Sequence, residues 1–345
     1  MERAIEKELQ NTLKVFAPIS LQQLNASVSF LERIDTKYLV HVKDLAKIVQ
    51  ELEKDYYVLN IKDIRVFDYD NVYMDSKALD FYYAHERGDA VRVKVRTRNY
   101  VDSNLCFFEY KHKEGKLIRK FRYQEDPAKF GVMDEDAAHF FASIYGSLME
   151  GSTKIDIAPT MKTTYKRFTL CSKYGDERIT IDLDLSFTDP NDPESKRIEL
   201  PHVAIIESKA SSTKSRTAKV MKKFGITKAG GCSKYCLGLI YFDKVASHKR
   251  FKDTIAFIEK TGGSISHHKV QKKKRAVVAK SASAVSTLKK AVLAPATKAA
   301  VKATKKVLAP KAKALLTPVK KPTRAVAVKS TAKKSVATRK APAKK

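Results

Sequence analysis

The sequence of 345 residues has no tryptophan and only four cysteines, and long apolar runs are missing. The cysteines, at 106, 171, 232 and 236, are too few and too scattered for a disulfide framework, and the last two are at most half of a metal site. No apolar stretch approaches the roughly 18 residues that span a bilayer, and the N-terminus lacks the basic and then apolar order of a signal peptide. These absences predict a soluble, intracellular protein of the cytoplasm with reduced thiols.

Acidic and aromatic residues are absent from the C-terminal part of the chain. Of the 68 Lys and Arg residues, 24 lie between Ile265 and Lys345, but none of the 38 Asp and Glu residues does. This stretch consists largely of Lys, Ala, Val, Pro, Ser and Thr, and it cannot bury enough apolar area to offset its chain entropy. We therefore predict a disordered basic tail over residues 263–345, after a mildly basic body that holds every Phe and Tyr.

The body shows two kinds of periodicity. Apolar residues recur at helical spacing in 2–15, 42–55, 134–149, 214–224 and 243–260. Alternation of apolar and polar residues predicts strands over 64–74, 91–99, 105–112, 117–124, 161–169, 177–187 and 202–210. Short turns join several of these strands, for example at Glu114-Gly115, which favours antiparallel neighbours. We predict an α+β fold with an N-terminal helical segment (1–26) and one main domain (27–262).

The strand over 91–99 carries four cations at alternate positions, from Arg92 to Arg98, with valines between them. Because successive side chains of a strand point to opposite faces, all four project to the same side. The later strands repeat this pattern with Lys111, Lys113, Lys120, Arg122, Arg167 and Arg178. One such strand would be an ordinary solvated face, but a face built this way over five strands repels itself unless it holds an anion.

Closing such a sheet into a barrel would aim the cations at a common axis, where a multiply charged ligand such as a triphosphate would balance them. Two glutamates, Glu109 and Glu207, fall among the cations and are candidate ligands of a divalent metal that bridges phosphate oxygens. The alternative for each glutamate is a salt bridge with a neighbouring lysine.

Several motifs occur in an order that points to a known family. They are Glu32-Arg33-Ile34-Asp35-Thr36-Lys37-Tyr38, Val72-Tyr73-Met74-Asp75-Ser76 with His85, Arg92-x-Lys94-x-Arg96-x-Arg98-x-Tyr100, Phe108-Glu109-Tyr110-Lys111-x-Lys113, Tyr165-x-Arg167, Arg178-x-Thr180-x-Asp182, Glu207-x-Lys209 and Cys232-Ser233-Lys234-Tyr235. With these motifs the chain, from about residue 27 to 245, resembles the catalytic domain of the vacuolar transporter chaperone (VTC) polyphosphate polymerases. These belong to the CYTH-like triphosphate tunnel metalloenzymes.

The resemblance implies an antiparallel eight-stranded barrel that forms a tunnel, decorated by helices. It also implies transfer of the terminal phosphate of bound ATP onto a polyphosphate chain, with Mn²⁺ or Mg²⁺ as cofactor. The implied catalytic residues are Lys37, Arg96 and Lys234, and the metal ligands are Glu207 and Glu109. The expected phosphate-binding residues are Arg92, Lys94, Arg98, Lys111, Lys113, Lys120, Arg122, Tyr165, Arg167, Arg178 and Lys209.

One motif departs from the wider superfamily, whose cyclase-like and thiamine-triphosphatase members have Glu-x-Glu-x-Lys where this chain has Arg33-x-Asp35-x-Lys37. This difference favours the polymerase branch but removes two metal ligands. A tripolyphosphatase or nucleoside triphosphatase would need the same tunnel, and a non-catalytic protein could use it to hold polyphosphate. The basic tail is expected to bind nucleic acid or other polyanions through its phosphate contacts.

Overall fold

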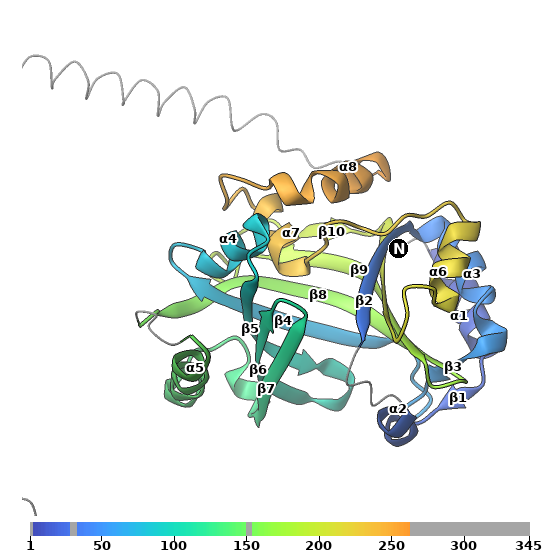
Figure 1. Ribbon diagram of the computed structural model, residues 1–345, viewed down its shortest axis with the longest axis horizontal. Coiled ribbons are helices and arrows are strands. Elements are labelled where there is room, and N and C mark those ends of the chain that lie inside the picture. The colour runs from blue at the N-terminus through green and yellow to red at the C-terminus, as the bar shows by residue number, and fades with distance from the viewer. Residues whose placement is uncertain (1–2, 28–32, 150–153, 263–345) are drawn as a thin grey trace, which may run out of the picture. The chain divides into compact units, whose positions relative to one another are not determined.

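The computed structural model describes residues 3–27, 33–149 and 154–262, so the predicted basic tail lies outside the described residues. The helices are α1 (Arg3–Lys14), α2 (Leu21–Ser27), α3 (Val42–Gln50), α4 (Asp80–Arg87), α5 (Glu135–Leu148), α6 (Arg216–Lys223), α7 (Lys234–Tyr241) and α8 (Lys252–Lys260) (Figure 1). None of these helices of the described part is long and apolar enough to cross a bilayer.

The strands form one large sheet. They are β1 (Pro18–Ile19), β2 (Ile34–His41), β3 (Tyr56–Leu59), β4 (Phe67–Ser76), β5 (Val91–Tyr100), β6 (Leu105–Glu114), β7 (Leu117–Glu125), β8 (Ile157–Ser172), β9 (Glu177–Thr188), β10 (Ile198–Leu200) and β11 (Val203–Ala210). The main path is β2-β11-β9-β8-β4-β5-β6-β7, and every neighbouring pair along it is antiparallel. The predicted α+β fold with eight antiparallel strands is confirmed, and all seven strands predicted from alternation are present.

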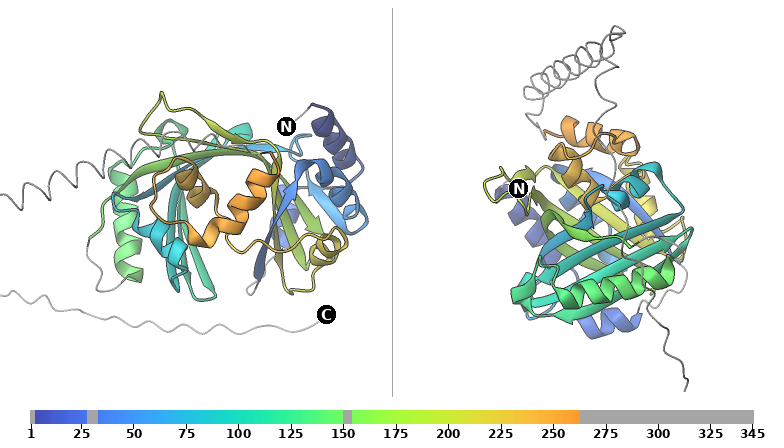
Figure 2. Two further views of the ribbon diagram at one scale, coloured as in Figure 1. Left: turned by 90° about the horizontal axis from the view of Figure 1, so that it is seen from above. Right: turned by 90° about the vertical axis from the view of Figure 1, so that its left-hand side faces the viewer.

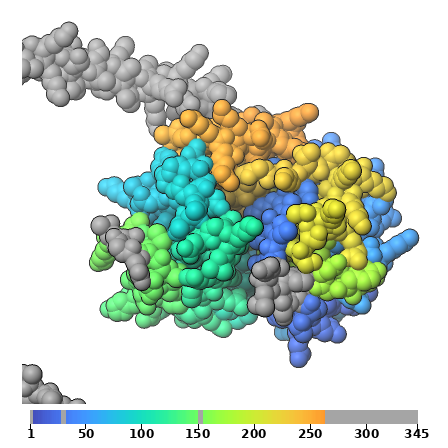
Figure 3. Space-filling model, in the orientation of Figure 1, coloured from blue at the N-terminus to red at the C-terminus, as the bar shows by residue number. Residues whose placement is uncertain are grey.

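The sheet is strongly curved but is not closed by backbone hydrogen bonds. The left view of Figure 2 shows it bending around the region that α7 and α8 occupy. Within the described residues, the end strands β2 and β7 are not paired with each other. Figure 3 shows a hollow in the surface between the teal β6 and β7 and the yellow segment that follows β11, with blue residues of the N-terminal part visible in it. The predicted tunnel therefore has an open seam.

The convex face of the sheet is apolar and is covered by helices. At one end, α1, α3 and α6 bury side chains such as Leu45 and Met221 against Ile179 and Ile181 of β9. At the other end α5 packs Phe141 on the valines of β5. Alternation along each strand then leaves the opposite, concave face to the polar side chains and, under α7, to a second apolar cluster that includes Met161, Phe187 and Ile205.

Helix α7 packs on the concave face near one end of the sheet. Ser233 caps its N-terminus, and the hydroxyl of Tyr235 donates to Asp75, whose carboxylate also accepts from backbone amides at the start of α4. Gly238 lies against Met161 so closely that a Cβ at this position would be 2.7 Å from the Met161 side chain. The absence of a side chain at Gly238 thus allows α7 to approach the sheet and to hold its first turn among the charged residues.

Candidate functional site

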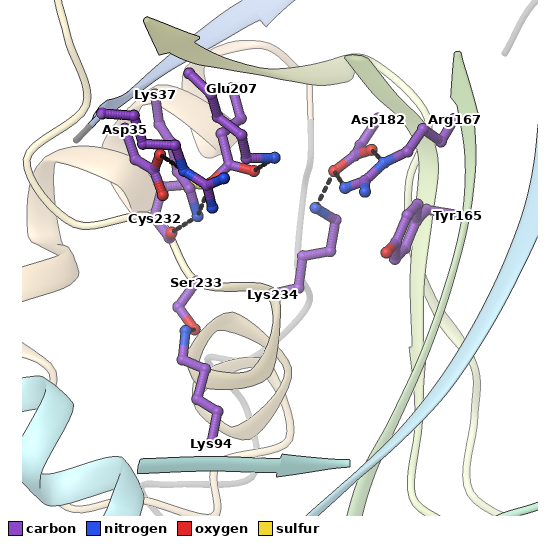
Figure 4. A network of polar contacts seen from close by, with 12 residues as sticks. Asp35, Lys37, Lys94, Tyr165, Arg167, Asp182, Glu207, Cys232, Ser233 and Lys234 are labelled. Carbon is purple, nitrogen blue, oxygen red and sulfur yellow. Dashed lines mark hydrogen bonds and ion pairs between the residues drawn. The ribbon is translucent and has the colours of Figure 1, made fainter. Parts of the chain in front are cut away.

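Strand register places all the predicted site residues of the sheet on the concave face. Lys37 lies opposite Glu207, Lys209 opposite Arg178, and Arg167 opposite Asp182. The four cations of β5 lie opposite every second residue of β6, from Phe107 to Lys113. The residues that share this face are Lys37, Arg92, Lys94, Arg96, Arg98, Glu109, Lys111, Lys113, Lys120, Arg122, Tyr165, Arg167, Arg178, Glu207 and Lys209. Lys234 joins them from the first turn of α7 (Figure 4).

Asp182 holds two of these cations together. Its carboxylate accepts from Arg167, at 2.5 Å from Nε and 2.8 Å from Nη2, and also from the ammonium group of Lys234. Burial opposes ionisation of Asp182, but Arg167 and Lys234 hold its pKa well below its usual range. Lys234 also lies over the ring of Tyr165, 4.5 Å from its centre. The charge on Asp182 therefore fixes the position of Lys234, which projects from α7 toward β9 (Figure 4).

Glu207 pairs with two lysines in the same way. Its oxygens lie 3.6 Å from Lys37 Nζ and 3.0 Å from Lys209 Nζ. Lys37 also donates to the carbonyl oxygen of Cys232 at 3.1 Å, at the loop that precedes α7. Burial disfavours the charge on Lys37, yet Glu207 keeps its pKa above the ordinary value. Lys37 is therefore charged at neutral pH and lies beside the first turn of α7.

The carboxylate of Glu109 is the third one on this face that pairs with two cations. Arg96 donates to one of its oxygens from Nε at 2.8 Å and from Nη2 at 2.7 Å, and Lys120 donates to the other oxygen. The side chain of Glu109 is only 2% exposed. Although burial raises the pKa of Glu109, Arg96, Arg98 and Lys120 lower it further than burial raises it. Both oxygens of this carboxylate are thus occupied by cations.

Four cations at the adjoining ends of β5 and β6 have no such partner. Arg92 pairs in register with Lys113, and Lys94 pairs with Lys111. In the described ranges, none of the four forms an ion pair with a carboxylate; Lys94 donates instead to the hydroxyl of Ser233 at 3.0 Å. Burial and repulsion from neighbouring cations lower the pKa of both Lys94 and Lys111 to about 8. These unbalanced charges mark the part of the concave face that is suited to an anion.

The remaining predicted cations occupy other positions on the face. Arg98 is buried and donates to Asn71 Oδ1 at 2.8 Å, whereas Arg122 lies over the ring of Phe107. Arg178 donates to the carbonyl of Leu24 in α2 at 2.7 Å, and its Nε is buried without a partner among the described residues. Arg98 and Arg178 are therefore partly engaged by the protein itself.

Comparison with known protein families matches residues 32–242 to the VTC domain. The chain belongs to the VTC domain family. This match covers more than half of the chain and confirms the resemblance that its motifs predict. A comparison with curated proteins found no match.

Two solved structures are similar to this VTC domain. One is a putative adenylyl cyclase from Hippeastrum, described as having a dominant triphosphatase activity; it is 14% identical, and the match covers 63% of this chain and 99% of that one with a TM-score of 0.36. The other is a putative adenylate cyclase from Vibrio parahaemolyticus, 11% identical, with 59% and 97% coverage and a TM-score of 0.34. Both scores are low, so the family assignment rests on the domain match.

The VTC domain was expected to hold a divalent metal through Glu207 and Glu109. Among the described residues, no group of three or more His, Cys, Asp or Glu side chains could hold a metal ion. Mg²⁺ is commonly held by one or two carboxylates and substrate phosphates. Glu207, whose side chain is 18% exposed, fits such a role better than Glu109, whose oxygens are both engaged. The residues fit a metal that is bound together with phosphates, and they do not form a complete cage for one.

Sequence reasoning assigned no role to three groups that organise this VTC domain. Asp182 was part of a motif, and its alternation with Arg178 was a signal that it shares the cationic face. The hydroxyl of Ser233 and the carbonyl of Cys232 could be found only from the structure, because they contact lysines of distant strands.

Proposed function

We propose that the VTC domain of this chain transfers the terminal phosphate of ATP onto the end of a polyphosphate chain. The observation that supports this most is a group of four cations that have no carboxylate partner in the part of the chain that the structure describes. They are Arg92, Lys94, Lys111 and Lys113, and they lie beside the positioned lysines 37 and 234. A ligand with several negative charges close together neutralises such a group, whereas a single carboxylate does not.

Phosphoryl transfer suits a site of this composition. The reaction breaks the bond between the β and γ phosphates of ATP, forms a bond from the γ phosphorus to a terminal oxygen of the chain, and releases ADP. It asks the protein mainly to position phosphates and to neutralise their charge, which cations already fixed by carboxylates do without reorganisation. We assign this role at the reacting phosphate to Lys37, Arg96 and Lys234, and the other concave-face cations to the flanking phosphates. A metal held by Glu207 would neutralise further phosphate charge.

The test is incubation of the purified chain with ATP and Mn²⁺ or Mg²⁺, followed by gel analysis of the products and assays for ADP and orthophosphate. Long phosphate chains and ADP are the expected products. Lys234→Gln should reduce their formation, whereas Lys219→Gln, on the exposed side of α6, should not. Orthophosphate without chains would replace the polymerase with a triphosphatase. Binding without turnover under any metal would leave a polyphosphate-binding protein.

Affinity for tripolyphosphate should depend on pH through Lys94 and Lys111. Their pKa values of about 8 lie below the ordinary 10.5, so both lose charge in the free protein as the pH rises above 8. Because the anion binds the protonated form, affinity should fall above this pH, by up to about tenfold per pH unit for each lysine. Calorimetric titration between pH 7 and pH 10 measures the slope.

The matched control for this pH series is the double variant Lys94→Arg/Lys111→Arg, which stays charged throughout. Subtracting the pH slope of the variant's affinity from that of the parent removes the contribution from titration of the ligand itself. An identical slope for both proteins would show that the two lysines do not titrate in this range.

The basic tail forms the second part of the proposal: we infer that residues 263–345 bind long polyanions independently of the VTC domain. Lys and Arg without interleaved aromatic residues contact phosphates and release counterions, with no sequence preference. Deleting the tail should leave turnover largely unchanged and make the salt dependence of DNA or polyphosphate binding much shallower. The slope should fall by about 0.7–0.9 log units per log unit of salt for each phosphate that the tail neutralises in the full chain. Equal slopes for the full and shortened chains would contradict this role.

A further inference from the structure

Arg250 lies next to the cationic face although it is outside residues 32–242, the part matched by the family. It belongs to the short helix η4 (Lys249–Phe251), which follows α7 and is packed against two glycines. The guanidinium of Arg250 rests on Gly88, the left-handed residue (φ 82°) that ends α4, and the Arg250 carbonyl lies against Gly231. A Cβ at Gly88 would displace this guanidinium from its present position, and the positive φ of Gly88 favours glycine there.

Arg250 lies near two cations, and the nearby carboxylate of Glu86 accepts from the backbone amide of Lys249 at 3.0 Å. Arg92 and Lys113, which are paired in register on β5 and β6, are both repelled by the positive charge of Arg250. Burial and then Arg250 lower the pKa of Arg92, and burial, Arg92 and Arg250 all contribute to lowering the pKa of Lys113. Asp89, which attracts Arg92, is itself paired with Arg87 at 2.6 Å.

One buried polar atom of these three cations also has no partner among the described residues. The Nε atom of Arg92 is buried and has no hydrogen-bond acceptor in the described part of the chain. Across those same residues, none of Arg92, Lys113 and Arg250 has a carboxylate within ion-pair distance. A donor that is buried without an acceptor costs free energy unless a ligand supplies one.

Arg250 extends a row of cations that already runs along the sheet. From Arg96 the row continues through the Lys94 and Lys111 pair to the Arg92 and Lys113 pair at the start of β5. Arg250 is exposed and rests on Gly88, three residues before β5 begins, which places it next to this last pair. An extended polyanion that occupies the row from Lys94 outward would meet Arg250 where it leaves the protein.

We propose that Arg92, Lys113 and Arg250 form a separate subsite for the part of a phosphate chain that extends beyond a triphosphate. Arg250 would thus determine the preference for long chains over short ones. This inference rests on the proposed function in taking polyphosphate as the ligand, but it does not require turnover.

The test compares binding of tripolyphosphate and of size-fractionated long polyphosphate by calorimetric titration. It uses the full chain and a chain that lacks residues 263–345, because the tail is itself proposed to bind long polyphosphate. Arg250→Ala should weaken long-chain binding about tenfold, the effect of removing one charge-assisted hydrogen bond, and leave tripolyphosphate affinity unchanged. Arg250→Lys should recover part of the affinity because it keeps the charge. Lys252→Ala, an exposed neighbour in the first turn of α8, is the matched control and should change neither affinity.

Equal losses for the two ligands would overturn the subsite, since they would place Arg250 in the triphosphate site itself. Unchanged binding of both ligands to Arg250→Ala would overturn it as well. A full chain that binds long polyphosphate as described but makes none from ATP would remove the proposed reaction and leave the subsite in place.

Discussion

Replacing Lys111 with alanine is expected to weaken tripolyphosphate binding by about 1.5–3 kcal/mol, or roughly 10- to 150-fold, without destabilising the free protein. The ligand loses a charge-assisted hydrogen bond, but the fold loses no ion pair, because Lys111 has no carboxylate partner within the described residues. Burial and Lys94 disfavour its charge, so the melting temperature of the free variant should equal or exceed that of the parent. Titration calorimetry and thermal unfolding measure the two quantities.

The stability of the free protein should also depend on pH through Lys111. The pKa of Lys111 in the folded chain, about 8, lies below its ordinary value of 10.5, so the unfolded chain binds more protons between these values. The stability of the free parent should therefore rise with pH from about 8 to 10.5, and Lys111→Ala should reduce this rise. Lys219→Ala on α6 serves as the control and should match the parent in affinity. A lower melting temperature for Lys111→Ala in the absence of ligand would contradict the view that its charge is unbalanced.

Replacing Arg96 with alanine should have a different effect, a loss of about 3 kcal/mol in the free energy of unfolding. Arg96 makes two hydrogen bonds to Glu109, whose side chain is 2% exposed. The variant therefore leaves the buried negative charge of Glu109 without one of its cationic partners. Removal of one partner of a buried ion pair typically costs about 3–5 kcal/mol, and the remaining Lys120 places this case at the lower end. Urea unfolding of the free protein measures the loss.

The double variant Arg96→Ala/Glu109→Gln is the control for this prediction. It removes the orphaned charge and should recover much of the lost stability, while ligand binding stays weak because the cation is missing. If single and double variants are equally unstable, packing and not the charge of Glu109 explains the loss. The comparison also separates the contribution of Arg96 to the ligand from its contribution to the fold.

Most of the sheet could be predicted from the sequence because its strands alternate clearly between apolar and polar residues. Strand β2 did not show this pattern, since Ile34-Asp35-Thr36-Lys37 places polar residues on both faces. Helix α7 was missed for a different reason. Nearly all of its residues are buried, so it has no polar face to reveal a helical period, and Gly238 lowers its helix propensity.

The concave face was predictable to the same extent as the strands that form it. A period of two is enough to place Arg92 and Lys94 on one side of β5. Ion pairs such as that of Lys234 with Asp182 were not predictable, because they depend on the position of α7 over β9. The sequence pattern therefore identified which cations share the concave face, but not which of them are already balanced by carboxylates.

The open seam between β2 and β7 gives the domain a mechanical property that a closed barrel lacks. In a closed barrel, the hydrogen bonds between all neighbouring strands fix the circumference of the barrel. Here the two sides of the sheet are joined across the concave face by adjacent residues of one loop: Cys232 accepts from Lys37 of β2, and Ser233 accepts from Lys94 of β5. This clasp consists of two side-chain hydrogen bonds of 3.1 and 3.0 Å, and both donors are cations that an anion would attract. An anion bound in the groove would thus compete directly for the hydrogen bonds that join its two sides.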